Sequence, residues 1–213
     1  MACAKVFWQN PYLTALEAVV THVNGDVITV DQTIIYAFSG GQQSDAGTIG
    51  GMPVLEAKKE GFEIYYTLPN GHGLRVGDKV QQRIDWEKRY KLMKLHFAAE
   101  LILECVYQDY GHPEKVGANI TEDKARVDFY WEGNITSIFP ELLARVQTLI
   151  ANDLMITSAF SDESNEIRYW EIEGFAKIPC GGTHIKRTSE IGAIRLKRNN
   201  IGGGKERIEI LLT

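Results

Sequence analysis

Residues 85–113 read DWEKRYKLMKLHFAAELILECVYQDYGHP, and this stretch decides how the chain is organised. It lacks Gly and Pro from Trp86 to Tyr110, Asp85 is placed to cap a helix, and Gly111 with Pro113 ends the pattern. Apolar residues recur at helical spacing, namely Trp86, Tyr90, Met93, Phe97, Leu101 and Cys105. From residue 95 to 107 the helix is apolar nearly all round, so we expect its second half to be buried.

Residues 1–84, before this helix, have the pattern of strands and tight turns. Residues 17–39, EAVVTHVNGDVITVDQTIIYAFS, alternate around Asn24-Gly25, a strong hairpin signal. Residues 60–68, EGFEIYYTL, form a further strand-like run, and turn clusters follow at short intervals. We predict a small β-barrel domain over residues 1–84, carrying a glycine-rich loop.

Residues 85–213 mix strands and helices without βαβ regularity. A strand pair is predicted over 115–131, a helix opens at Pro140, strands continue to Trp170, and a β segment runs from 178 to 213. The second domain is therefore predicted to be α+β, with the long helix buried against an antiparallel sheet. The chain as a whole is expected to be α+β.

The composition is that of an ordinary soluble globular protein, with 24% charged and 44% hydrophobic residues. No apolar run reaches the roughly 18–20 residues of a membrane span, and the start lacks the pattern of a secretory signal. The three cysteines lie far apart, at Cys3, Cys105 and Cys180. They indicate a reducing, cytoplasmic compartment rather than a disulfide framework.

Basic residues gather in two stretches, 75–94 and 186–207. Together these hold 14 of the 23 basic residues and only 5 of the 28 acidic ones, while the whole chain has a formal net charge of −5. If the two stretches meet in the fold, they could bind a polyanion such as a nucleic acid. Two solvated faces that never meet are the alternative.

His96 and Glu100 interrupt the apolar part of the long helix. Four residues apart, they project from one helix face with Cβ atoms about 5–6 Å apart. That spacing fits a hydrogen-bonded core pair, two ligands of one metal ion, or an acid/base couple. A buried carboxylate is unfavourable unless a cation or a metal accompanies it, so burial favours the metal site.

A second pair of metal-type donors lies in residues 178–192, IPCGGTHIKRTSEIG. Gly181, Gly182 and Thr183 separate Cys180 from His184, which favours a tight loop that brings thiolate and imidazole together. A thiolate with imidazoles suits zinc, and the candidate ligands of one ion are His96, Glu100, Cys180 and His184. Nucleophilic Cys/His catalysis is the alternative. The metalloprotease signature H-E-x-x-H and the deaminase signature P-C-x-x-C are absent.

A glycine-rich loop occupies residues 39–51, SGGQQSDAGTIGG. Gly40 and Gly41 would let backbone amides approach a ligand closely, and Ser44 and Asp45 could hydrogen-bond that ligand. A tight turn with no ligand is the alternative.

Taken in order, three motifs resemble one family. They are GGQ-x-S-D-x-G at 40–47, I-D-W-E-K-R-Y-x-L-M-x-L-H at 84–96 and C-G-G-T-H-x-x-x-T-S-E-I-G at 180–192. This is the pattern of the alanyl-tRNA editing proteins called AlaX, in their medium-length form, and the resemblance runs from about residue 14 to 213. These proteins are free-standing relatives of the editing domain of alanyl-tRNA synthetase, and the second domain is also similar to the editing domain of threonyl-tRNA synthetase.

The resemblance implies a zinc-dependent deacylase that acts in trans on tRNA for alanine bearing serine or glycine. His96, Cys180 and His184 match the family's ligand positions, whereas Glu100 stands where relatives have a second helical histidine, and Phe97 where they have a small hydroxyl residue. The pocket for the amino acid would be lined by Gly40, Gly41, Gln42, Ser44, Asp45 and Thr183. Glu100 would serve either as a fourth zinc ligand or as the catalytic base.

The expected partner is the aminoacylated acceptor end of tRNA, held through its phosphates by the two basic stretches. No membrane and no obligate protein partner is inferred. Two other functions remain open: a non-catalytic, zinc-stabilised module that binds tRNA or a synthetase, and editing of a different mischarged tRNA.

Overall fold

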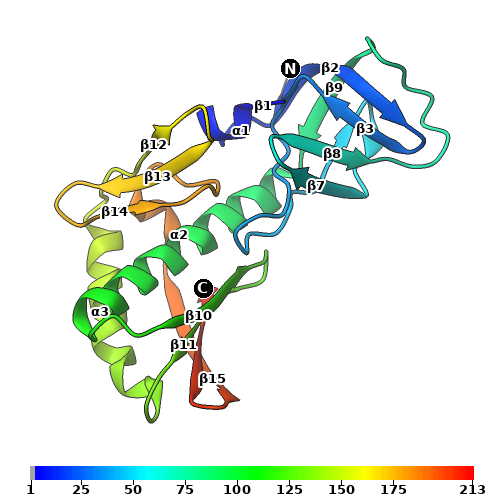
Figure 1. The fold of residues 1–213 in the computed structure, drawn as a ribbon. Coiled ribbons are helices and arrows are strands. Elements are labelled where there is room, and N and C mark those ends of the chain that lie inside the picture. The colour runs from blue at the N-terminus through cyan, green and yellow to red at the C-terminus, as the bar shows by residue number, and fades with distance from the viewer. Residues whose placement is uncertain (1–2) are drawn as a thin grey trace. The chain divides into compact units, whose positions relative to one another are not determined.

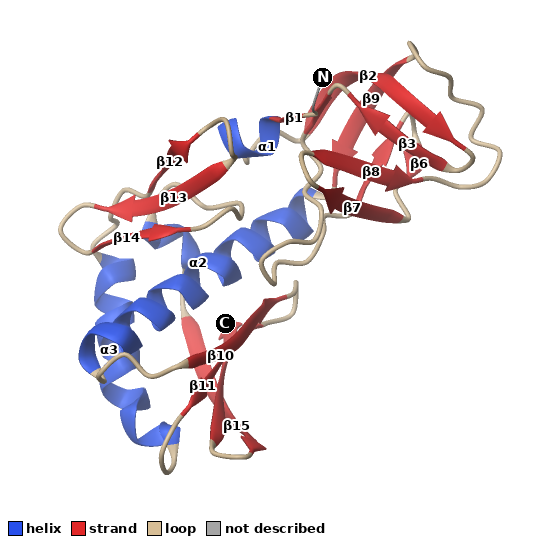
Figure 2. Ribbon diagram, in the orientation of Figure 1, coloured by secondary structure: helices blue, strands red, loops and turns tan. Residues whose placement is uncertain are grey.

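The computed structural model describes residues 3–213, which form two units. The first unit runs to Ser39 and resumes over Gln43–Tyr90, while the second comprises Gly40–Gln42 and Lys91–Thr213. Strands predominate over a few helices, so the predicted α+β class is confirmed (Figures 1 and 2). That residues 1–84 and 85–213 act as separate functional domains stays a prediction. In the described part of the chain, no helix has the length and apolar character needed to cross a membrane.

A seven-stranded antiparallel sheet makes up most of the first unit. Its strands, in the spatial order β6-β5-β9-β2-β3-β8-β7, curl like part of a barrel (Figure 2). Their bounds are β2 Ala15–Asn24, β3 Val27–Val30, β5 Gly47–Ile49, β6 Met52–Pro53, β7 Glu56–Glu60, β8 Glu63–Thr67 and β9 Lys79–Ile84. Beside the sheet, β1 (Ala4–Lys5) pairs in parallel with β4 (Gln32–Thr33), and helix α1 spans Val6–Gln9.

The hairpin of β2 and β3 forms where the sequence predicts it. Asn24 pairs with Val27, so the turn itself is Gly25-Asp26, one residue further along than the predicted centre. Gly25 has φ of +63°, a conformation that glycine adopts without steric cost. A two-residue turn with glycine at its first position matches the twist of the flanking strands.

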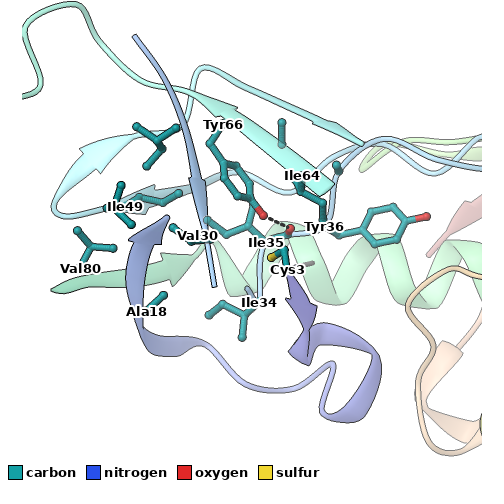
Figure 3. Close-up of a cluster of buried hydrophobic side chains, with 14 of the residues drawn as sticks. Cys3, Ala18, Val30, Ile34, Ile35, Tyr36, Ile49, Ile64, Tyr66 and Val80 are labelled. Carbon is teal, nitrogen blue, oxygen red and sulfur yellow. Dashed lines mark hydrogen bonds between the residues drawn. The ribbon is translucent and has the colours of Figure 1, made fainter. Parts of the chain in front are cut away.

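The core of the first unit lies on one face of the curled sheet (Figure 3). Burial alternates along β8, where Ile64 and Tyr66 point inward. The Tyr66 hydroxyl donates to the Ile35 carbonyl oxygen at 3.1 Å and lies 2.7 Å from Thr33 Oγ1. The polar end of a buried tyrosine is therefore satisfied within the core.

Helix α2 (Trp86–Asp109) forms where the sequence predicts it. Asp85 Oδ1 accepts a hydrogen bond from the Lys88 backbone N at 3.0 Å, which satisfies one of the free amides at the helix start. Gly111, with φ of +74°, follows the end of the helix. Both end signals in the sequence are thus confirmed.

The second unit contains two antiparallel sheets. The larger has the order β10-β11-β16-β15 and the smaller β12-β13-β14. The strand bounds are β10 Lys115–Ile120, β11 Ala125–Tyr130, β12 Thr157–Asp162, β13 Ile167–Ile172, β14 Ala176–Pro179, β15 Ile194–Gly202 and β16 Lys205–Leu212. Helix α3 (Phe139–Ala151) carries Pro140 in its first turn, and the 3₁₀ turns are η1 (Ile135–Ile138) and η2 (Thr188–Ile191).

Within the second unit, α2 runs between these two sheets (Figure 1). Phe97 packs edge-on against Trp170 of β13, with ring centroids 5.2 Å apart. Two residues before the end of the helix, the Tyr107 ring lies 6.4 Å from the Phe129 ring of β11. Glu100 lies between these two points on the helix, and His96 directly precedes Phe97.

Candidate metal centre

The loop after β14 brings Cys180 and His184 together. The Cys180 backbone N donates to the Arg168 carbonyl at 2.9 Å, which fixes the start of the loop against β13. A Cβ at Gly182 would overlap the His96 ring and lie 2.8 Å from Gln42 Oε1. Glycine is thus required there by close packing, and the predicted tight approach of the C-G-G-T-H loop has a steric reason.

Three donor atoms converge at this point: His96 Nε2, Cys180 Sγ and His184 Nε2. The sulfur lies 3.4 Å from the first nitrogen and 3.3 Å from the second, and one ligand atom from each residue lies within 4.8 Å of the others. His96 is 5% and His184 4% exposed. Residues 84 positions apart in the sequence therefore form a buried group that could hold a metal ion.

The other ring nitrogens of the two histidines are also engaged. His96 Nδ1 donates to Gln42 Oε1 at 2.7 Å, and the Thr183 backbone N donates to the same oxygen at 3.1 Å. Because a backbone N–H can only donate, the Gln42 amide is oriented with its oxygen toward both groups. His184 Nδ1 lies 2.9 Å from Ser158 Oγ on β12. Both Nε2 atoms thus face the sulfur, an arrangement usual for metal-ligating histidines.

Glu100 lies beside this group. Its Oε1 is 3.2 Å from His96 Nε2, as the i, i+4 spacing predicts, and its side chain is 15% exposed. The cluster of three converging donors does not include it. Its role as a fourth ligand or as a base therefore stays a prediction.

The charges of the site are strongly coupled. Burial lowers the pKa of His96, but interactions with Cys180 and then with the Glu100 carboxylate outweigh burial and raise it to about 10. Burial raises the pKa of Glu100, while His96 outweighs it and lowers the pKa to about 2. Burial, reinforced by the charge on His96, lowers the pKa of His184 to about 3. The metal-free site thus holds a cationic His96 and a neutral His184.

The donor set suits zinc. Zinc binds imidazole nitrogen at about 2.0–2.1 Å and thiolate at about 2.3 Å, so tetrahedral ligands of these two kinds lie roughly 3.5 Å apart. The N···S separations of 3.3 and 3.4 Å are close to that value. His96, Cys180 and His184 would hold the ion, and its arrival would displace the proton on His96 Nε2.

The glycine-rich loop is divided between the two units. Gly40, Gly41 and Gln42 belong to the second unit, where Gln42 is fully buried. Its Nε2 donates to Thr183 Oγ1 at 2.8 Å. Gly41 has φ of +85°, and a Cβ there would lie 2.6 Å from the Ala118 carbonyl oxygen. The structure therefore brings Gln42 and Thr183 to the metal centre.

Ser44 and Asp45 belong to the first unit, where they bond within their own loop. Ser44 Oγ accepts from the Phe38 backbone N at 2.7 Å. Asp45 accepts from the Tyr36 backbone N at 2.6 Å and forms a fully buried ion pair with Arg89. Their predicted role in substrate binding is untested, and their bonds hold the shape of the loop.

Two further side chains complete the site and were missed from the sequence. Ser158 is not part of any sequence motif that would have indicated a role in the site. Arg168, 4% exposed, donates to the Gly182 carbonyl oxygen at 3.4 Å. It shares the buried face of β13 with Trp170, two residues further on, so the strand alternation itself could have revealed a charge directed inward.

Phe97 occupies space directly beside the metal centre. It is fully buried, and its ring lies 5.6 Å from that of His184. A bulky apolar side chain therefore forms one wall next to the ligands.

Comparisons with known proteins agree with this architecture. Residues 167–209 match the family described as "Threonyl and Alanyl tRNA synthetase second additional domain". The chain is 34% identical to the alanyl-tRNA editing protein AlaX-M of Pyrococcus horikoshii, over 98% of this chain and 97% of that protein. It is 31% identical to AlaX-M of Methanosarcina barkeri, over 97% of this chain and 98% of that protein. It is also 30% identical to the alanine–tRNA ligase of Methanococcus aeolicus, where 96% of this chain matches 25% of the ligase.

These matches define a protein of the class that shares one region with alanine–tRNA ligases. The chain belongs to the AlaX-M family of alanyl-tRNA editing proteins.

Proposed function

We propose that this protein is a deacylase that acts in trans on tRNA for alanine carrying serine, or glycine, and that it uses one zinc ion. One observation carries the proposal: the donor atoms of His96, Cys180 and His184 converge in a buried site of a chain that matches AlaX-M proteins along nearly its whole length. A bound zinc ion would supply polarisation of the ester carbonyl.

Glu100 is proposed either to ligate the ion or to move a proton. Burial raises its pKa, but in the metal-free site His96 outweighs burial and lowers the pKa to about 2, so the carboxylate is ionised there. With His96 engaged in metal binding, Glu100 Oε1 would accept a proton from the attacking water. If it ligates instead, it adds negative charge to the site and weakens the polarisation of the ester.

Thr183 and the Gly40–Gln42 segment are proposed to recognise the amino acid. The Thr183 hydroxyl accepts from Gln42 Nε2, so it keeps its own proton to donate to a seryl hydroxyl. A site that hydrogen-bonds a substrate hydroxyl rejects an analogue lacking it far better than an apolar site could. Selection against alanine, the correct amino acid, would follow from this contact.

Deacylation of Ser-tRNA and Ala-tRNA, both on tRNA for alanine, tests the proposal. Zinc-loaded wild type should hydrolyse the first ester and spare the second, and zinc content should be measured on the same samples of Glu100→Ala and Glu100→His. Retained zinc with lost turnover supports a base, and lost zinc supports a ligand. If the zinc-loaded protein leaves Ser-tRNA and Gly-tRNA intact, the deacylase proposal fails and a binding module is favoured.

A further inference from the structure

The four-stranded sheet β10-β11-β16-β15 has one face turned away from helix α2 (Figure 1). Phe129 of β11 lies on the other face, where its ring approaches that of Tyr107. Side chains alternate between the two faces along a strand, and residues paired across antiparallel strands share a face. The register therefore gathers charged side chains on the face away from α2, which we call the charged face: Arg126 and Asp128 of β11, Lys205, Arg207 and Glu209 of β16, and Arg195 and Lys197 of β15.

The charged face is positive although the whole chain is negative. Five of its charged side chains are basic and two are acidic, which gives +3, whereas the whole chain has a formal net charge of −5. Both carboxylates are buried, Asp128 at 4% and Glu209 at 6% exposed, while Arg195 and Lys197 are exposed. A ligand that approaches this face meets the cations first, so its chemical complement is a polyanion.

Asp128 fixes the two arginines at the centre of the charged face. Its Oδ1 accepts from Arg207 Nε at 2.8 Å and its Oδ2 from Arg207 Nη2 at 3.0 Å, and Arg126 Nη1 also donates to Oδ2. One carboxylate shared by two guanidinium groups leaves one net positive charge. Because Arg207 bonds through Nε and Nη2, its Nη1 group is left for a ligand, and a guanidinium already fixed loses little freedom when it binds a phosphate.

Glu209 plays the same part for lysines of the charged face. Lys124, in the turn before β11, donates to Glu209 Oε1, and Lys197 lies opposite Glu209 across the sheet. At one end of the face Tyr130 is 44% exposed, and Lys205 Nζ lies 5.3 Å from its ring centroid. Basic side chains beside an exposed aromatic ring are a combination that binds RNA through its backbone and bases.

We propose that the charged face binds the phosphate backbone of the tRNA acceptor stem. The inference rests on the proposed function, which makes a tRNA the substrate, and it assigns the surface that holds the double-stranded part of that tRNA. Lys124 and Arg126 lie outside both basic stretches of the sequence, so this surface is one sheet face built from three strands rather than two stretches that meet. The metal centre lies on the α2 side of the sheet, so the unpaired 3′ end would pass around a sheet edge, across a layer roughly 10 Å thick.

Binding of deacylated RNA tests the assignment without any hydrolysis. The probes are deacylated tRNA for alanine and an RNA hairpin that copies its acceptor stem, each followed by fluorescence anisotropy with the full-length, zinc-loaded protein over a salt series. We expect Arg126→Gln and Arg207→Gln each to weaken binding of both probes several-fold and to lower the salt dependence by about one phosphate contact. Arg207→Lys keeps the charge but not the planar fork, so it should keep the salt dependence of wild type and bind less tightly.

Lys177→Gln is the matched control, since it removes one positive charge from β14, which belongs to the other sheet of the same unit. It should bind both probes as wild type does, and thermal unfolding should show all four variants folded. Failure of wild type to bind the hairpin, or unchanged affinity and salt dependence in both Arg→Gln variants, overturns the assignment. Selective loss in the Arg→Gln variants supports it even if wild type fails to hydrolyse Ser-tRNA, a result that would overturn only the proposed function.

Discussion

At the scale of single residues, the contacts of His96 decide which of its two ring nitrogens faces the metal site. Its Nδ1 is held by Gln42, while its Nε2 faces the Cys180 sulfur and the Glu100 carboxylate. Fixing one nitrogen leaves the other as the donor to a metal, which is the usual way that proteins choose a histidine tautomer. The contact depends on a close approach that only Gly182 permits.

Gly182→Ala should therefore abolish metal binding without unfolding the protein, because its new Cβ would displace the His96 ring and the Gln42 amide. Gly181→Ala is the matched control, since a Cβ at Gly181 meets no atom within 4 Å. The zinc content of each variant after dialysis tests this prediction. Equal zinc content in the two variants would show that metal binding does not need the close packing at Gly182.

Zinc uptake should release at least one proton per ion near neutral pH. The pKa of His96 is raised to about 10, so the metal-free site is protonated there, whereas the bound form needs the neutral imidazole. Apparent affinity should thus rise with pH up to about 10 and fall as pH is lowered, with His184 contributing no proton because its pKa is lowered to about 3. Calorimetry in two buffers of different protonation enthalpy measures the release. Heats that do not depend on the buffer would contradict it.

At the scale of elements, Arg89 anchors the first turns of α2 within the first unit. Its guanidinium is fully buried, pairs with Asp45 and also donates to the carbonyl oxygens of Pro11 and Ile34. One cation thus ties the helix start to three other segments, including the end of the glycine-rich loop.

Asp45→Ala should destabilise the first unit by about 3–5 kcal/mol, because it leaves the buried charge of Arg89 without its counter-ion. Faster hydrogen exchange in peptides of β2 and β3, with a lower thermal transition, would report the effect. Glu60→Ala is the control, since its pair with Lys58 is exposed and should matter little. Similar exchange in both variants would mean that the buried pair does not hold the unit.

At the scale of the whole molecule, many of the basic side chains in the 186–207 stretch are neutralised locally. Arg187 pairs with Asp153, Arg198 with Glu206 and Arg207 with Asp128. Arg195 and Lys197 are exposed on the same strand, β15, where Lys197 lies opposite Glu209 of β16. These two are the residues of the stretch best suited to meet phosphates.

Arg195→Gln and Lys197→Gln should each weaken tRNA binding several-fold and lower the salt dependence by about one phosphate contact. Lys58→Gln, outside both basic stretches, should leave the binding curve unchanged. Fluorescence anisotropy over a salt series measures affinity and slope together. If the slopes of all three variants equal that of wild type, β15 does not contact the tRNA backbone.

The sequence by itself determined the elements and the kinds of donor in the site. Alternation with a turn at Asn24-Gly25 predicts the β2–β3 hairpin, and apolar spacing between Asp85 and Gly111 predicts α2, because neighbouring residues decide both. The His96–Glu100 contact also follows from helical spacing alone.

Only the tertiary structure decided how these donors are held. Gln42 meets His96 54 residues away and Thr183 141 residues away, all within the second unit. Asp45, only three positions after Gln42, pairs with Arg89 within the first unit. Ser158 reaches His184 from a strand with no motif. Periodicity and turn chemistry act over a few residues, whereas a choice of partner across such separations depends on how packed segments exclude water and satisfy buried polar groups.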